Sequence, residues 1–572
     1  MKILLTAINA KYIHSNPAVY SLKKASGPWQ DQVEIAEFTI NNQKDYILSE
    51  LFRRKPQVLC FSVYIWNLEL VESTARELHK LLPQVPIWVG GPEVSFETAA
   101  FLQEHPYVTG VMIGEGEATF RELCACYCEG KVSEKQLDAI AGLAFRGKDG
   151  QIRFTLPRQA LDMSSLPFAY DTEEDFSNRI IYYESSRGCP FRCSYCLSSV
   201  EKTLRFRDIE LVKKELQFFI DRKVPQIKFV DRTFNCRHDH AMAIWSYLIE
   251  HDNGITNFHF EVAADLLTEE ELQLMARMRP GLIQLEIGVQ STNTATIEEI
   301  HRTMKLAEVK RIVERIREGG NIHQHLDLIA GLPFEDYDSF RRSFDEIYAL
   351  KPDQLQLGFL KVLKGSYMYE HAAEYGLVYH DTPPYEVMYT RWLSYEELLR
   401  IKQVEEMLEV YYNSGQYEIT MKVVEPLFAS AFDFFLALGA FYDRRGYFGM
   451  SHSRLRRCEI LLEFFEEYEA KTHTREEILP LLQEALTFDL YYRENCKSRP
   501  FWAPDPASFK EMTHRNCRNG KLSHIEPFHY DFPQKRQLRI DTLPVRKEEI
   551  VWALFSYDRR DPLDHQAEVS FI

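Results

Sequence analysis

The sequence predicts an α/β protein: two parallel sheets, then a mainly helical C-terminal region with a short strand-rich tail. Three observations lead to this prediction. Short apolar strands alternate with helical segments through residues 1–130, the alternation resumes at Ile180, and long amphipathic helical patterns follow residue 375. Strands that alternate with helices pack as a parallel sheet covered on both faces. We therefore divide the chain into residues 1–130, a linker with a hairpin at 131–178, residues 179–375 and residues 376–572.

The first 130 residues are predicted to form a five-stranded, doubly wound sheet. The strands are Ile3–Ile8, Val33–Phe38, Val58–Tyr64, Ile87–Val89 and Val108–Ile113, and the helical segments include Leu68–Leu82 and Glu117–Cys128. This rhythm suggests a flavodoxin-like (Rossmann-type) domain, whose ligands bind at the carboxyl ends of the strands. Cys124, Cys126 and Cys128 share the last helical segment. Because Cys124 and Cys128 follow its apolar spacing, we interpret these cysteines as core residues rather than metal ligands.

Small and polar residues follow three of these strands, where a ligand of such a sheet would lie. They are Ser62 and Tyr64 after the third strand, Gly90 and Gly91 after the fourth, and Gly114 and Glu115 after the fifth. Glycine lets the backbone approach a large ligand closely, although each motif alone is equally typical of a plain tight turn. Together, the six residues form a candidate ligand-binding edge.

A hairpin and a second run of strands come next. Leu143–Phe154 alternates apolar residues around a turn at Asp149–Gly150, which predicts a β-hairpin. Six further strands are expected: Ile180–Glu184, Gln226–Val230, Asn257–Val262, Leu282–Gly288, His323–Ile329 and Gln354–Gly358. In βα barrels the functional side chains lie at the carboxyl ends of the strands, so the second site is expected there.

Three cysteines stand directly after the first of these strands. Cys189, Cys193 and Cys196 have the spacing C-x3-C-x2-C, so one short loop carries three thiolates. Three thiolates hold three irons of a cubic [4Fe-4S] cluster and leave the fourth iron open, whereas an electron-carrying cluster takes four cysteines. A zinc knuckle is the alternative, but zinc prefers four ligands, and neither Cys nor His follows closely behind Cys196.

This motif, with Tyr195 before the third cysteine, resembles that of the radical S-adenosylmethionine (SAM) enzymes. The resemblance implies a partial (β/α)6 barrel that ends near residue 375. It also implies that the amino and carboxylate groups of SAM chelate the open iron, and that reductive cleavage then gives a 5′-deoxyadenosyl radical. An external low-potential electron donor, such as flavodoxin or ferredoxin, would be the redox partner.

Polar residues on the later strands resemble the SAM contacts of the coproporphyrinogen-dehydrogenase type of radical SAM enzyme. Besides Tyr195, they are Glu261, Gln290, Ser291, Arg302 and Asp327. By this resemblance Gln290 and Asp327 hold the ribose hydroxyls, while Glu261 and Arg302 hold the methionyl end. A guanidinium suits a carboxylate, and a carboxylate suits hydroxyls or an ammonium. For each residue alone, a salt bridge at the barrel lip is the alternative.

The end of the second barrel strand departs from that pattern. Many relatives carry a Gly-Gly-Glu segment there that takes the SAM amino group through backbone atoms, whereas this chain carries Asp231, Thr233 and Asn235. We regard these three residues as candidate substitutes, with a position facing the substrate as the alternative for Asp231.

The first domain, placed before such a cysteine loop, resembles the cobalamin-binding domain of B12-dependent radical SAM enzymes. Cobalamin is then the ligand implied for the candidate edge. The D-x-H-x-x-G motif, whose histidine binds cobalt in other cobalamin proteins, is missing from the loop between Asn9 and Pro17. We interpret His14 in that loop as a polar surface residue. A domain that binds no corrinoid and serves as a scaffold is the alternative.

Residues 376–572 resemble the uncharacterised C-terminal domain of one branch of these proteins. Helices such as Ser394–Tyr412 and Arg475–Leu490 precede the tail strands Phe528–Phe532 and Ile550–Tyr557. We expect this region to close the barrel mouth and shape the substrate pocket. A helical packing or dimerisation module is the alternative.

Composition limits the partners. The chain has 572 residues and a formal charge of −17, which argues against a broad nucleic-acid surface. The apolar N-terminal run stops at Asn9, and the apolar stretch Phe432–Tyr442 is too short to span a bilayer. Eleven cysteines without a disulfide pattern fit a reducing compartment. We therefore expect a cytoplasmic protein with no membrane partner and a small-molecule or peptide substrate.

The resemblance implies an enzyme that uses a [4Fe-4S] cluster, SAM and cobalamin, and a C-methyltransferase is the function it favours. In such enzymes cobalamin carries a methyl group from one SAM, and a second SAM supplies the radical that activates the substrate carbon. One alternative keeps both cofactors for a cyclisation, rearrangement or redox step. Others are a radical SAM enzyme with a scaffold domain and a non-enzymatic iron-sulfur sensor. No substrate-transforming side chain is assigned.

Overall fold

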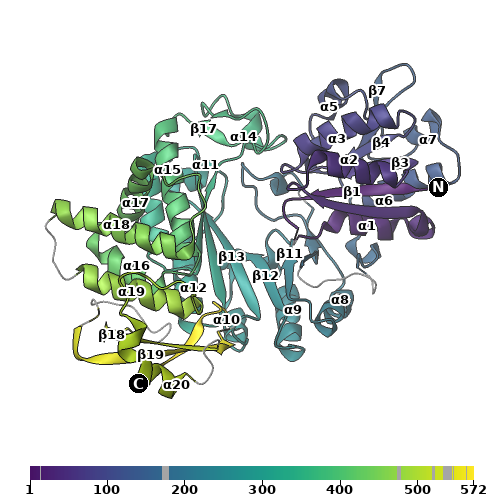
Figure 1. Ribbon diagram of the computed structural model, residues 1–572. Coiled ribbons are helices and arrows are strands. Elements are labelled where there is room, and N and C mark those ends of the chain that lie inside the picture. The colour runs from purple at the N-terminus through teal and green to yellow at the C-terminus, as the bar shows by residue number, and fades with distance from the viewer. Residues whose placement is uncertain are drawn as a thin grey trace.

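A computed structural model describes the chain except for residues 13, 171–178, 202, 473–477, 518–521, 533–543, 545 and 562. The protein is α/β, as predicted, and has three parts. Figure 1 shows the N-terminal domain on one side of a central barrel and the C-terminal helices on the other side. The site described below lies where the N-terminal domain meets the barrel.

The N-terminal domain is a seven-stranded sheet in the order β2-β1-β3-β4-β5-β6-β7. Its strands are β1 (Ile3–Asn9), β2 (Val33–Thr39), β3 (Val58–Ser62), β4 (Ile87–Gly90), β5 (Gly110–Met112), β6 (Leu143–Arg146) and β7 (Ile152–Phe154). Strands β1 to β5 are parallel and have the order of flavodoxin-like sheets. The predicted hairpin, β6 and β7, extends the same sheet because β6 pairs antiparallel with β5.

Helices cover both faces of this sheet. They are α1 (Pro17–Ala25), α2 (Lys44–Arg53), α3 (Leu68–Leu81), α4 (Pro92–Ser95), α5 (Thr98–Glu104), α6 (Glu117–Cys128) and α7 (Glu134–Asp138). Side chains alternate between the two faces of a strand, so Leu4 of β1 packs with residues of α2 and α3, and Leu5 packs with residues of α1 and α6. Cys124 lies in the second of these cores, as the helical spacing predicted.

The barrel is an open, all-parallel sheet in the order β15-β14-β13-β12-β11-β8. Its strands are β8 (Ile180–Tyr183), β11 (Gln226–Phe229), β12 (Asn257–Val262), β13 (Ile283–Gln290), β14 (His323–Ala330) and β15 (Gln354–Phe359). The covering helices are α8 (Ile209–Asp221), α9 (His238–Glu250), α10 (Glu269–Met275), α11 (Thr294–Glu299), α12 (Leu306–Gly319) and α13 (Tyr337–Tyr348). All six strands were predicted from the sequence.

The two faces of the barrel sheet differ in polarity. Along β13, Ile283, Leu285 and Ile287 are buried, and Glu286 lies on the opposite face. That face is polar, because the Glu286 carboxylate lies 3.0 Å from Lys228 Nζ on β11 and 2.9 Å from His259 Nε2 on β12. The inside of the barrel is therefore lined by charged and hydrogen-bonding groups, as a cofactor site requires.

Other parts of the chain cover both edges of the open barrel. At the β15 edge, the Asn413 side chain accepts a hydrogen bond from the Leu355 N–H and donates one to the Leu355 carbonyl, both at 2.9 Å. At the β8 edge, the Ser15 N–H donates to the Ile180 carbonyl at 3.3 Å. Exposed strand edges pair readily with other chains, and these contacts remove that liability.

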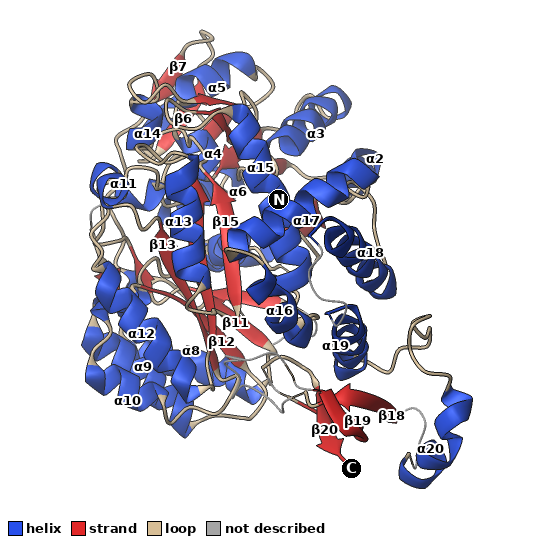
Figure 2. Ribbon diagram, turned by 90° about the vertical axis from the view of Figure 1, so that its left-hand side faces the viewer, coloured by secondary structure: helices blue, strands red, loops and turns tan. Residues whose placement is uncertain are grey.

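The C-terminal region packs against the β15 side of the barrel (Figure 2). It contains α15 (Tyr395–Leu408), the π-helix η6 (Glu409–Asn413), α16 (Glu418–Val424), α17 (Ala431–Arg445), α18 (Arg454–Thr472), α19 (Ile478–Arg493), α20 (Lys510–Asn516), β18 (Ser523–Tyr530), β19 (Arg546–Arg560) and β20 (Ala567–Phe571). The start of the predicted helix Arg475–Leu490 lies outside the described residues. One hydrophobic core runs through the barrel and this region, as in the contact of Phe344 on α13 with Phe435 on α17.

Among the residues that the structure describes, no single helix has the length and apolar composition of a membrane span. The segments Glu418–Leu427 and Ala431–Arg445, which are bent by 100° relative to each other, meet those two criteria only as a pair.

Residues 361–392, which we call the strap, leave the end of β15 and reach the N-terminal domain. The strap contains α14 (Tyr367–Glu370), β16 (Val378–Tyr379) and β17 (Val387–Tyr389). Tyr369 Oη donates to Glu97 Oε1 at 2.6 Å, and Tyr385 Oη donates to Glu93 on α4, directly after β4. The strap therefore joins the end of the barrel to the carboxyl edge of the first sheet.

Candidate functional site

A two-stranded ribbon closes the loop that carries the three cysteines. Strands β9 (Ser186–Arg187) and β10 (Arg205–Phe206) pair antiparallel, with Arg187 opposite Arg205. Cys193 is buried, and Cys189 and Cys196 are partly buried. The amide of Ser194 donates to the Ile300 carbonyl at 2.9 Å, which ties the loop to the barrel. The ribbon and this bond hold the three thiols at the carboxyl end of β8.

The three thiols suit a cluster better than a single ion. All eleven cysteines are free, and within the described part of the chain no three Cys, His, Asp or Glu side chains are grouped closely enough to hold one metal ion. A cubane cluster bridges its cysteines over a wider span than one ion does. Three cysteines on one loop are therefore a donor set that fits three irons of a cluster.

Arg302 connects the cysteine loop to the barrel. Its Nη1 lies 3.7 Å from Cys193 Sγ and 3.4 Å from Tyr195 Oη, and its Nη2 donates to the Gly288 carbonyl. Burial raises the pKa of the Cys193 thiol, and the positive charge of Arg302 opposes that rise. The sequence-predicted residues Tyr195, Arg302 and Cys193 are thus brought together.

Gln290 and Asp327 each present a buried oxygen that lacks a hydrogen bond. Gln290 has a φ of 74° and ends β13 at a register shift after Gly288, the residue that pairs with Asp327 on β14. Gln290 Oε1 and Asp327 Oδ1 are buried and accept no hydrogen bond from described residues, although His325 Nε2 lies 3.2 Å from Asp327 Oδ1. Strained backbone and unsatisfied polar atoms cluster at ligand sites, so two acceptors here fit a ligand with hydroxyl groups.

Burial perturbs the two carboxylates of this set. It raises the pKa of Glu261 to about 7, with a further contribution from the charge of Glu286, and Arg232 opposes the rise. Burial together with Glu286 and Glu261 raises the pKa of Asp327 well above its usual range. Glu261 forms no hydrogen bond or ion pair with any described residue. A cationic ligand would therefore stabilise its ionised form.

Ser291 and two residues after β11 are used by the fold itself. The buried Ser291 hydroxyl donates to Glu335 at 2.7 Å, so it holds a turn rather than facing the pocket. Asp231 is buried and accepts hydrogen bonds from Ser185 N, Ser185 Oγ and Ser186 Oγ. Asn235 exchanges two bonds with the Ala263 backbone.

The side chains of Asp231 and Asn235 are therefore occupied by the fold, and a contact of their backbone with the SAM amino group stays a prediction. Asp231 also does not face a substrate, because its carboxylate orients the start of the cysteine loop. Only Thr233 approaches the cysteines, with its hydroxyl 3.5 Å from Cys189 Sγ.

The candidate edge of the N-terminal domain gathers as predicted at the carboxyl ends of β3, β4 and β5, since Ser62 ends β3 and Gly90 ends β4. Tyr64 stacks on Trp66 with ring centroids 4.4 Å apart. Gly91 has a φ of 127°, and a Cβ there would lie 2.2 Å from the Val63 carbonyl, so this glycine is required by the chain itself. Gly114, with a φ of 75°, has open space around its Cα.

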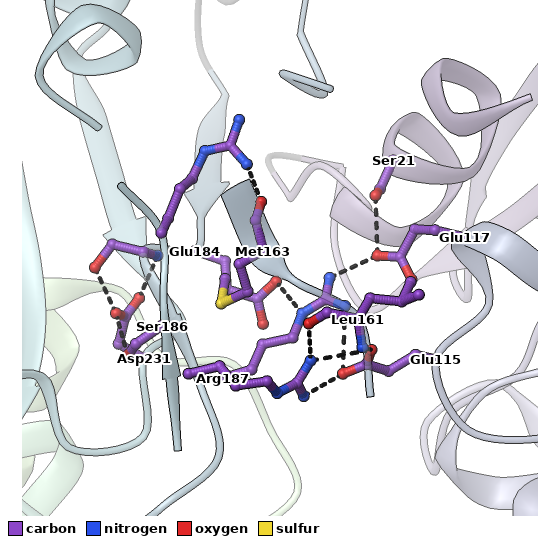
Figure 3. A network of polar contacts seen from close by, with 12 residues as sticks. Ser21, Glu115, Glu117, Leu161, Met163, Glu184, Ser186, Arg187 and Asp231 are labelled. Atoms are coloured by element: carbon purple, nitrogen blue, oxygen red, sulfur yellow. Dashed lines mark hydrogen bonds and ion pairs between the residues drawn. The ribbon is translucent and has the colours of Figure 1, made fainter. Parts of the chain in front are cut away.

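Glu115 faces the barrel instead of that edge. Its carboxylate binds Arg205, with Oε2 3.2 Å from Nη1, and its Oε1 lies 3.6 Å from Arg187 Nη1 (Figure 3). Burial raises the pKa of Glu115, but hydrogen bonding to Arg205 and the charge of Arg187 outweigh that effect and lower it. Its assignment as a cobalamin contact is therefore replaced by a role at the domain interface.

Sequence reasoning missed several interface residues. Arg187 also binds Glu117 at 2.6 Å and Glu184 at 2.8 Å (Figure 3). His14 was interpreted as a surface residue, but its Nδ1 shares a 2.8 Å hydrogen bond with Tyr182 Oη on β8. The one available signal was position in the sequence, because Arg187 lies two residues before Cys189 and Glu117 begins α6 shortly after β5.

Three family matches cover most of the chain. The B12 binding domain family matches residues 3–124, the radical SAM superfamily matches residues 183–347, and a protein family of unknown function, DUF4080, matches residues 373–542. The first match covers β1 to β5 of the N-terminal sheet, the second covers β11 to β14 of the barrel sheet, and the third begins inside the strap.

Among curated proteins, the chain is 25% identical over 321 residues to the cobalamin-dependent radical SAM methyltransferase TokK of Streptomyces tokunonensis. That match covers 50% of this chain and 44% of TokK. The chain is also 20% identical over 338 residues to the anaerobic magnesium-protoporphyrin IX monomethyl ester cyclase of Rubrivivax gelatinosus, covering 57% of this chain and 60% of the cyclase. The chain thus spans about half the length of these relatives.

Among solved structures, the chain is similar to the cobalamin-dependent SAM radical enzyme OxsB with aqua-cobalamin and SAM bound. The TM-score is 0.57 at 14% identity, covering 85% of this chain and 83% of OxsB. The methyltransferase TsrM of Kitasatospora setae, with tryptophan and a SAM analogue bound, gives a TM-score of 0.54 at 18% identity, covering 67% of this chain and 80% of TsrM. These similarities support the fold assignment, and the chain combines an N-terminal B12 binding domain, a radical SAM domain and a C-terminal DUF4080 region.

Proposed function

We propose that the protein is a cobalamin-dependent radical SAM enzyme and that it methylates a carbon atom of its substrate. One observation carries the first part: the loop with three thiols meets Arg302 at Cys193, and Gln290 and Asp327 present unsatisfied acceptors on the neighbouring strands β13 and β14. When bound, the cluster, SAM and cobalamin would supply a 5′-deoxyadenosyl radical and a transferable methyl group. The protein's own task is to bind and orient the cofactors and the substrate and to exclude water from the site.

The proposed roles of the barrel residues follow from their contacts. Cys189, Cys193 and Cys196 would hold the cluster, with Tyr195 packed beside Arg302. The remaining Arg302 hydrogen-bonding capacity suits a carboxylate, and the unpaired Glu261 carboxylate suits an ammonium. Gln290 and Asp327 would accept hydrogen bonds from ribose hydroxyls.

In the N-terminal domain we propose that cobalamin lies on the edge formed by Ser62, Tyr64, Gly90, Gly91 and Gly114. The open space at Gly114 and the exposed Trp66 beside Tyr64 favour this edge. Its neighbour across the interface is the ribbon at the base of the cysteine loop, which supports a site shared by both domains.

Methyl transfer is favoured because the relatives include several proteins named as methyltransferases. Ring formation is the second candidate, because the relatives also include three named as magnesium-protoporphyrin IX monomethyl ester cyclases. We further propose a small-molecule or peptide substrate, a flavodoxin or ferredoxin as electron donor, and a reducing compartment such as the cytoplasm, consistent with eleven free thiols.

The test is anaerobic purification with reconstituted iron and sulfide and added hydroxocobalamin. Iron, sulfide and cobalt are then measured per chain in the wild type, in Cys193→Ala, and in Cys126→Ala as a control on α6. We expect about four irons and bound cobalt in the wild type and the control, and loss of iron in Cys193→Ala. Iron without cobalt would leave the N-terminal domain as a scaffold, and a wild type without iron would refute the proposal.

A further inference from the structure

The ribbon beneath the cysteine loop places two arginines directly opposite each other. Arg187 on β9 pairs in register with Arg205 on β10, and the loop that this pair closes contains all three cysteines. Like charges directly opposite on neighbouring strands destabilise the pairing. Their side chains are only 15% and 12% exposed, so solvent screens them little.

Carboxylates of both domains neutralise the two arginines. Glu184 and Glu201, on the barrel side, each bind one arginine and are 33% and 43% exposed. Glu115 and Glu117 come from the N-terminal domain and are 18% and 7% exposed. Of these four carboxylates, only Glu115 has oxygens that approach both arginines. The most buried of these ion pairs therefore join the N-terminal domain to the barrel.

Other contacts hold the two glutamates in place. Ser21 Oγ of α1 donates to Glu117 Oε1 at 3.1 Å, and the Leu161 amide donates to Glu115 Oε2 at 3.1 Å. Arg205 Nη1 in turn donates to the Leu161 carbonyl at 2.7 Å. The loop after β5, the connector and the ribbon thus form one polar network, and the ribbon docks on a preformed acidic site.

We propose that Glu115 and Glu117 of the N-terminal domain are positioning residues for cluster assembly, because they permit the ribbon that shapes the cysteine loop to close. This inference rests on the proposed cluster at Cys189, Cys193 and Cys196. Removing one partner of a buried ion pair leaves an uncompensated charge, which is more costly than removing both partners. Loss of the two glutamates therefore opens the ribbon. Removal of Arg205 as well relieves the repulsion between the two arginines and lets the ribbon close again.

The experiment compares the wild type, Glu115→Gln/Glu117→Gln, the same variant with Arg205→Gln, and Glu122→Gln. The last is a matched control, because Glu122 lies on α6 and binds Arg158 at 2.7 Å away from the ribbon. Iron and sulfide are measured after identical anaerobic reconstitution. In the cluster-free proteins, amide hydrogen exchange is measured over residues 203–207, with thermal denaturation to verify folding.

We expect the double variant to retain less than about half of the wild-type iron and to exchange these amides at least about tenfold faster, since the ribbon is open. Adding Arg205→Gln should restore most of the iron, and Glu122→Gln should match the wild type. Wild-type iron and exchange in a folded double variant would overturn the inference, as would iron loss that Arg205→Gln does not restore. A wild type that binds no iron would instead refute the proposed function.

Discussion

The guanidinium of Arg302 lies 3.7 Å from the sulfur of Cys193, although the two residues are 109 positions apart in the chain. Arg302 follows α11, and Cys193 lies in the loop after β9, so the fold of the whole first half of the barrel brings them together. A cation at this position stabilises the thiolate form of Cys193 and remains available to an anionic ligand group.

Replacing Arg302 by lysine should weaken SAM binding by at least about tenfold, or about 1.4 kcal/mol. Lysine keeps the charge but loses the planar fork that binds a backbone carbonyl and a carboxylate together. Equilibrium binding of SAM to the cluster-loaded protein measures this effect. Arg311→Lys, on the exposed face of α12, is the control, and equal affinity in the two variants would contradict the assignment.

SAM affinity should rise with pH up to about 7 and level off above it. The folded protein holds Glu261 with a pKa raised to about 7, so below that pH its carboxyl is protonated and is a weaker hydrogen-bond acceptor for the SAM amino group. One proton released on binding gives at most about a tenfold change in affinity per pH unit. Titrations from pH 6 to 8, by calorimetry, test this in the wild type and in Glu261→Gln.

The raised pKa of Glu261 also makes the stability of the folded protein depend on pH. Because the pKa of Glu261 is raised on folding, the folded state binds a proton that the unfolded state releases between about pH 4.5 and 7. Stability from this group is therefore lost as pH rises through that window. Glu261→Gln should bind SAM more weakly, and its SAM affinity should not change with pH in this range. Its denaturation midpoint should also vary less with pH than that of the wild type. If both pH dependences match those of the wild type, Glu261 is not the titrating group.

Asp231→Ala should destabilise the barrel by about 3 kcal/mol, because it removes the buried carboxylate that accepts three hydrogen bonds from Ser185 and Ser186. The cysteine loop begins at these serines, so iron content after reconstitution should fall in parallel. Thermal denaturation and iron analysis are the measurements. Asp239→Ala, at an exposed position on α9, should leave both unchanged, and a stable, iron-loaded Asp231→Ala would show that the loop is held in another way.

Asn413→Ala should cost about 2 kcal/mol and make the protein prone to self-association, since it removes both hydrogen bonds to Leu355 and exposes the edge of β15. Light scattering and thermal denaturation report the two effects. Asn516→Ala removes a hydrogen bond within α20 alone and serves as the comparison. If both variants remain equally monomeric, Asn413 does not protect the edge.

Strands were predicted well because the signals are local. The apolar runs of both sheets and the helical spacing around Cys124 required only neighbouring residues, and the C-x3-C-x2-C motif identified the loop directly. The hairpin at Asp149–Gly150 was also predicted, but not its place beside β5. A turn sequence specifies the pairing of its own two strands and carries no information on the next neighbour.

The roles of single polar residues were harder to predict, because a side chain at a strand end can serve a ligand or the fold. Ser291 and Asp231 have the residue types expected of ligand contacts, yet Glu335 and the serines of the cysteine loop occupy them. Glu115 lies at the expected edge and turns toward Arg205. Each partner is distant in sequence, so only the assembled fold distinguishes these cases.

The continuous core shared by the barrel and the C-terminal helices has a consequence for how this protein can change over evolution. The N-terminal domain has cores of its own and meets the barrel largely through ion pairs and hydrogen bonds, including those of Glu115 and Glu117. Such a module can be exchanged for another that again supplies carboxylates to Arg187 and Arg205. The C-terminal helices share their interior with the barrel, as Phe344 and Phe435 do, so the two must be inherited and diversify as one unit.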